Sequence, residues 1–200
     1  MTNSTLWADV AHPIFIGLHG NPAVGDSIVG LKYDNLDIIC QDESQIDYQG
    51  CLAINCGDGV AYASIHGNTA EVANKFAEIL RSKGAEKVVV CDLSRTDMSE
   101  AVEAAFRYSH LVVAAASYDG DVFPVMHDFL HHLAIKNYSK RRIGIIENGS
   151  WAPSAGRAMR AIIDTFKGVT VAESMVTIMS SLKDSDIPAL ERLADEVLAE

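Results

Sequence analysis

The chain has 200 residues and an apolar fraction of 48%, enough for one folded domain with a small appendage. Its formal net charge of −11 disfavours nucleic acid as a partner, because the phosphates would be repelled, and suits a basic protein partner. No apolar run reaches the roughly 18 residues of a membrane-spanning helix, and residues 1–10 lack the pattern of a secretory signal, so we expect a cytoplasmic protein outside the membrane.

Residues 1–57 are predicted to form a small β-rich appendage. Two β-type runs, residues 27–33 and 36–40, flank a polar pair in the manner of a hairpin, and a third run covers residues 51–55. The sequence leaves three roles open for this appendage. The appendage could pack on the main domain, shape a homodimer, or be the remnant of a larger partner domain.

From residue 58 to residue 200, β-type and helical patterns alternate. The predicted strands are residues 59–64, 87–92, 111–116, 142–147 and 169–178, and the predicted helices are residues 69–83, 97–108, 123–135, 155–166 and 187–199. Thr96 and Ser154 are candidate helix caps, and Pro124 and Pro188 suit a first helical turn. Five strands alternating with five helices predict an α/β fold, a doubly wound parallel sheet covered on both faces.

The loop after the first of these strands has the character of an anion site. It carries hydroxyls at Ser64 and Thr69 and an amide at Asn68, and it opens directly onto a helix whose first N–H groups attract an anion. It contains no Lys or Arg, and neither the P-loop nor the Gly-x-Gly-x-x-Gly pattern is present. We therefore expect a phosphate held by hydroxyls and amides, although Ser64 and Thr69 could instead only cap the helix.

Two further strand-end loops, residues 117–121 and 148–152, each place one aromatic beside a glycine. The aromatics are Tyr118 and Trp151. In an open parallel sheet, ligands bind at the carboxyl ends of the strands where the strand order reverses. A phosphate site and two aromatics around one crevice suit a flat phosphorylated heteroaromatic such as flavin mononucleotide (FMN), although each aromatic could also be only a lid on the core.

These three loops carry a family resemblance. Residues 62–69 (YASIHGNT), 114–124 (AAASYDGDVFP) and 143–151 (IGIIENGSW) resemble, in order, the three flavin loops of flavodoxins, and most closely those of the flavodoxin-like domain of flavodiiron proteins. The resemblance implies a five-stranded sheet of order 2-1-3-4-5 that binds FMN. It also implies that Gly120 permits a peptide rearrangement beside the flavin. The residues that we expect to bind the cofactor are Ser64, His66, Gly67, Asn68, Thr69, Ser117, Tyr118, Asp119, Gly120, Asn148, Gly149, Ser150 and Trp151.

The sequence departs from the family at several positions. Alanines stand at 115 and 116 where a Ser-Pro turn is usual, Asp119-Gly120 replaces paired asparagines, and the third loop is one residue shorter. The His-x-Glu-x-Asp-His ligand run of the flavodiiron metal domain does not occur in these residues. We therefore expect no di-iron chemistry from this chain alone, and leave open whether it is a complete protein or one domain or subunit of a larger flavodiiron-type system.

No metal site is expected elsewhere. His127, His131 and His132 share one predicted helix, but no Glu or Cys completes a ligand set, and a solvated helix surface is the expectation. The cysteines show no Cys-x-x-Cys spacing, and reduced, partly buried thiols are expected. They are Cys40, Cys51, Cys56 and Cys91.

Two functions fit this pattern. The first is an FMN-binding electron carrier that serves a redox partner protein, which would explain why no catalytic residues can be assigned. The second is an FMN-dependent reductase that takes hydride from NAD(P)H and passes it to a quinone or flavin acceptor. A receiver domain is disfavoured, because Ser64 and Ser117 stand where such a domain needs acidic residues.

Overall fold

The computed structural model describes residues 4–7, 15–18, 31–33, 36–38 and 57–199. The chain divides into two compact units, residues 1–55 and 56–200, which are described separately. The predicted domain boundary between residues 57 and 58 and the role of the appendage stay predictions.

The first unit contains two antiparallel strand pairs. Strand β1 (Ser4–Trp7) pairs with β2 (Phe15–Leu18), and β3 (Leu31–Tyr33) pairs with β4 (Leu36–Ile38). The second pair has the hairpin arrangement that the sequence predicts. The β1–β2 pair was not predicted, and the predicted run at residues 51–55 lies outside the described residues.

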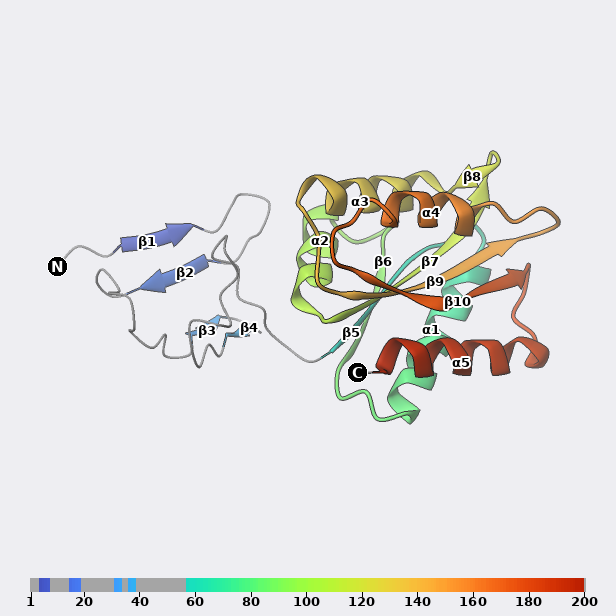
Figure 1. The fold of residues 1–200 in the computed structure, drawn as a ribbon, viewed down its shortest axis with the longest axis horizontal. Coiled ribbons are helices and arrows are strands. Elements are labelled where there is room, and N and C mark those ends of the chain that lie inside the picture. Colours follow the sequence, from blue (N-terminus) through green and yellow to red (C-terminus); the bar gives the residue numbers. More distant parts are fainter. Residues whose placement is uncertain (1–3, 8–14, 19–30, 34–35, 39–56, 200) are drawn as a thin grey trace. The chain divides into compact units, whose positions relative to one another are not determined.

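The second unit is built on a parallel sheet (Figure 1). Its parallel strands are β5 (Asp58–Ala63), β6 (Val88–Asp92), β7 (His110–Tyr118), β9 (Arg142–Gly149) and β10 (Thr170–Met179), in the spatial order β10-β9-β7-β5-β6. Numbered along the chain as five parallel strands, this order is the predicted 2-1-3-4-5, so the predicted fold is confirmed. One short antiparallel strand, β8 (Asp121–Val122), adds to the end of β7.

Five helices cover both faces of the sheet (Figure 1). They are α1 (Asn68–Ser82), α2 (Met98–Arg107), α3 (Pro124–Ile135), α4 (Ala155–Ile163) and α5 (Ile187–Leu198). Strand β7 shows why both faces are covered. Its Val113 packs into the core layer under α2, α3 and α4, whereas Val112 packs under α1 and α5, so a continuous apolar run fills both layers.

Some predicted boundaries were wrong. The side chain of Asp97, not Thr96, caps α2 by accepting a hydrogen bond from Ser99 N. Helix α4 ends at Ile163 rather than at residue 166, while β7 and β9 each run two residues beyond the predicted end. These longer strands carry the sheet to the edge where the candidate site lies.

Candidate functional site

A cavity of about 350 Å³ lies at the carboxyl ends of β5, β7 and β9, where the chain turns from strand to helix. The three predicted loops line it together. The lining residues are Ser64, Ile65, His66, Asn68, Thr69, Ala116, Ser117, Tyr118, Asp119, Gly120, Asn148, Gly149, Ser150, Trp151, Ala152, Ser154 and Ser180. The structure thus brings together every predicted site residue except Gly67, while their roles as cofactor ligands stay predictions.

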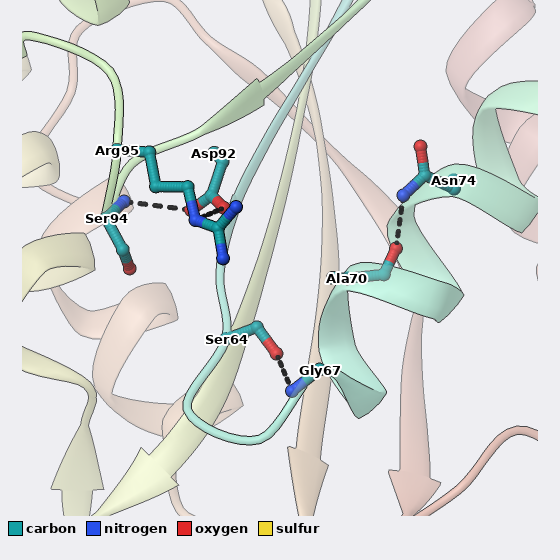
Figure 2. Close-up of polar contacts among 7 residues, drawn as sticks. All are labelled: Ser64, Gly67, Ala70, Asn74, Asp92, Ser94 and Arg95. Atoms are coloured by element: carbon teal, nitrogen blue, oxygen red, sulfur yellow. Dashed lines mark hydrogen bonds and ion pairs between the residues drawn. The ribbon is translucent and has the colours of Figure 1, made fainter.

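The β5–α1 loop, which the sequence predicts to bind an anion, forms part of the cavity wall. Gly67 has a φ of 94°, which a side chain would disfavour, and its N–H donates a 3.0 Å hydrogen bond to Ser64 Oγ (Figure 2). This bond closes the loop and leaves the Ser64 hydroxyl hydrogen free to donate. Thr69, in the first turn of α1, is buried and also lines the cavity, where the first N–H groups of a helix have no intrahelical acceptor. Gly67 does not line the cavity, so its role is to shape the loop.

No lysine or arginine is among the described residues that line the cavity. The arginine of the neighbouring β6–α2 loop, Arg95, forms an ion pair in which its Nε lies 3.5 Å from Asp92 Oδ2. The other oxygen of this carboxylate, Oδ1, accepts a hydrogen bond from Ser94 N (Figure 2). Next to this loop, burial and then the Asp92 carboxylate raise the pKa of Tyr62, so its phenol stays protonated at neutral pH. An anion in the cavity would be bound by uncharged donors.

The second loop is a tight hairpin, which the sequence analysis did not predict. Tyr118 on β7 pairs with Asp121 on β8, and the two residues between them, Asp119 and Gly120, have positive φ values of 49° and 76°. Two successive positive φ values define a type I′ turn, for which Asp-Gly is a preferred sequence. Tyr118 is 45% exposed at the cavity wall, and its ring meets the Phe123 ring edge-on at 5.8 Å.

The third loop is held by a residue that sequence reasoning missed, Ser180. The side-chain amide of Asn148 donates to the Ser180 carbonyl at 2.8 Å, and Ser180 N donates to the Gly149 carbonyl at 3.2 Å. Ser180 has a φ of 67° and follows the last strand, β10. Trp151, farther along the loop, is 91% exposed, so its ring stands open at the cavity rim.

Ser117 ties the second and third loops together. Its Oγ accepts hydrogen bonds from Ser154 N at 2.8 Å and Ala155 N at 3.1 Å, at the start of α4. The Ser154 hydroxyl donates in turn to the Asp121 carbonyl at 3.0 Å, so Ser154 occupies the cap position without capping the helix by its side chain. The hairpin and the start of α4 therefore form one connected wall of the cavity.

The groups that line the cavity suit FMN. The lining includes the hydroxyls of Ser64 and Thr69, the amide of Asn68 and the start of a 15-residue helix, which are groups of the kind that bind phosphate. It also includes two exposed aromatic side chains, Tyr118 and Trp151, whose faces can cover a flat ring.

Other candidate sites of the sequence analysis are not part of this cavity. His127 and His131 are exposed on α3 and His132 is half-buried, and no group of three or more potential metal ligands occurs in the part of the chain that the structure describes. Cys91 is half-buried on β6, where burial raises the pKa of its thiol. No helix within the described ranges has the length and apolarity to cross a bilayer.

This strand order and the cavity at its carboxyl edge define a flavodoxin-like fold. No protein-family model and no curated protein matches the sequence. Among solved structures, the chain is similar to rubredoxin oxygen:oxidoreductase from the anaerobe Desulfovibrio gigas, with 13% identity over 72% of this chain and 35% of that one and a TM-score of 0.67. For the flavodiiron protein from Giardia intestinalis the identity is 16% over 72% and 36% of the two chains, with a TM-score of 0.65.

Flavodoxins match over almost their whole length. The flavodoxin of Streptococcus pneumoniae TIGR4 is 27% identical over 70% of this chain and 96% of that one, with a TM-score of 0.60. The fold is thus that of flavodoxins and close to that of flavodiiron proteins, whereas this chain spans only about a third of the length of the flavodiiron structures, 35% and 36%.

Proposed function

We propose that this chain binds FMN in the cavity at the carboxyl ends of β5, β7 and β9 and carries electrons for a partner oxidoreductase. One observation carries the proposal: three loops that are distant in sequence meet around one cavity, and its lining includes both phosphate-type donors and exposed aromatics. The structural likeness to flavodoxins and flavodiiron proteins supports the same assignment.

Different residues of the chain bind the phosphate and the ring of FMN. Ser64, Asn68, Thr69 and the first N–H groups of α1 hold the phosphate, and Tyr118 and Trp151 cover the ring and exclude water from it. When bound, FMN supplies one- and two-electron transfer. The protein fixes the orientation of the ring and the charges around it.

The partner is expected to be a protein with a basic surface, since this chain has a net charge of −11. A flavodiiron-type protein or subunit is one candidate partner, because the fold is similar to that of flavodiiron proteins. Cytoplasmic residence remains an expectation from the sequence.

The test is a visible spectrum of the purified chain with and without added FMN, followed by anaerobic reduction. Binding of about one FMN per chain, with slow reduction by NADH or NADPH alone and fast reduction through a reductase partner, is the expected result. Direct and fast bleaching by NADH or NADPH would instead identify an FMN-dependent reductase. A chain that takes up no FMN would overturn both functions.

A further inference from the structure

A buried carboxylate, Glu147, lies directly behind the wall of the proposed FMN site. Glu147 is 5% exposed and immediately precedes Asn148 and Gly149, which line the cavity. Its side chain does not line the cavity itself. Instead it reaches the backbone of α4, the helix that begins at the cavity wall.

Two donors hold this carboxylate in place. Gly156 N, in the first turn of α4, donates to Oε2 at 2.7 Å, and the Thr177 hydroxyl, on the neighbouring strand β10, donates to Oε1 at 2.8 Å. The approach to the helix is close, because a Cβ added at Gly156 would lie 2.9 Å from Oε2. Each oxygen therefore has a donor, and one of these donors lies at the positive end of the α4 dipole.

Within the part of the chain that the structure describes, no cationic side chain pairs with Glu147. Glu147 takes part in none of the ion pairs found among the described residues. Ser117, which also binds the start of α4, contributes a neutral hydroxyl. A hydrogen-bonded carboxylate, with no ion-pair partner among the described residues, thus lies one residue behind the cavity lining.

We propose that Glu147 sets the reduction potential of the flavin, holding it lower than a neutral residue at this position would. This inference rests on the proposed FMN site. Uptake of two electrons and one proton by neutral oxidised flavin gives an anion, and a nearby buried negative charge opposes that change because little solvent screens it. Glu147 acts here as a positioning residue and as a fixed charge, without contact to the ring.

The experiment compares the full-length chain, reconstituted with FMN, with its E147Q variant. Glutamine keeps the shape and can still bond Gly156 N and Thr177, whose hydroxyl can turn to accept, so mainly the charge changes. We expect about a tenfold increase in the ratio of reduced to oxidised flavin at the wild-type midpoint, which is about 30 mV for a two-electron couple. The control is E191Q, which removes one charge from an exposed position on α5 and should leave the potential unchanged.

A second pair of variants decides the outcome if E147Q fails to fold. Thr177 is exposed, so Lys and Met, which have similar lengths, can both be accommodated there. T177K places a positive charge beside Glu147 and should raise the potential above that of T177M. Equal potentials for this pair, or an E147Q variant that binds FMN with the potential of E191Q, would overturn the inference. A wild-type chain that takes up no FMN would overturn the proposed function, and this inference with it.

Discussion

Asp58 Oδ1 lies 2.7 Å from His110 Nδ1, across the first paired positions of β5 and β7. Asp58 is 3% exposed, and the pair lies at the amino ends of these strands, away from the candidate site. A buried carboxylate needs such a partner, because burial without one is costly. The contact therefore joins β5 and β7 at the end of the sheet opposite the candidate-site loops.

The Asp58→Asn variant tests this role. It should lower the free energy of unfolding by about 1–3 kcal/mol, because the amide can still hydrogen-bond His110 but lacks the charge of the carboxylate. The measurement is denaturant unfolding, and Asp164→Asn is the matched control, since Asp164 forms an exposed ion pair with Arg160 that is worth about 0.5 kcal/mol or less. Equal stabilities for the two variants would contradict the prediction.

Thr69→Ala should weaken FMN binding roughly ten- to a hundredfold, because a hydrogen bond to a charged phosphate is lost from a buried position. Fluorescence titration of FMN with the apoprotein measures the Kd. The control is Thr170→Ala at the exposed start of β10, which should leave the Kd unchanged. An unaltered Kd in Thr69→Ala would restrict this residue to a structural role in the first turn of α1.

Trp151 should report directly on binding. Because its ring is 91% exposed in this structure, contact with FMN should quench its emission. The chain has 2 tryptophans, Trp7 and Trp151, so Trp151→Phe provides the matched background. We expect quenching in the wild type and almost none in Trp151→Phe. Equal quenching in both proteins would place the flavin away from Trp151.

Glu196 should make stability fall in acid. Burial raises the pKa of its carboxyl. Hydrogen bonds from the Ser174 side chain and backbone lower the pKa by more than burial raises it, so the net shift is downward. A group with a lowered folded-state pKa contributes stability that is present above its unfolded pKa of about 4.3 and is lost as pH falls through the folded pKa.

The measurement compares the unfolding free energy of the wild type and Glu196→Gln from pH 7 to pH 3. The wild type should be more stable at pH 7 by less than about 1 kcal/mol, since solvent screens this half-exposed group, and the difference should shrink on acidification. A difference that grows in acid would contradict the assignment.

Tyr138→Phe should leave stability unchanged or raise it by up to about 1 kcal/mol. The Tyr138 hydroxyl is buried and finds no hydrogen-bond partner among the residues of known placement, and burial raises the pKa of this phenol far above its usual value. Thr177→Val is the control, because the Thr177 hydroxyl donates a 2.8 Å hydrogen bond to Glu147 and its loss should cost about 1 kcal/mol. Thermal unfolding distinguishes the two, and a marked loss in Tyr138→Phe would reveal a partner for the hydroxyl.

The sheet could be predicted because the apolar pattern that indicates each strand lies within a few consecutive residues. In β7 every residue from Leu111 to Ala115 is buried, and such a continuous apolar run between helical patterns indicates a strand covered on both faces. The same reasoning located three of the loops around the cavity, since the carboxyl ends of parallel strands share one edge of the sheet.

Other parts of the site could not be found this way. The Asp119-Gly120 pair is a hairpin signal, but β8 has only two residues, too few for a strand pattern to show. Ser180 carries no signal of its own. It enters the site only because β10 lies beside β9, which brings its carbonyl to Asn148 across 32 residues of sequence.

The described residues that line the cavity include no lysine or arginine, and this has a consequence for the response to ionic strength. Where a cation binds a phosphate, added salt screens the attraction and weakens the complex. In the proposed site hydroxyls and amides hold the phosphate, and the long-range field of a chain with a net charge of −11 repels it. Added salt screens that repulsion, so this chain should retain FMN in concentrated salt at least as well as in dilute buffer.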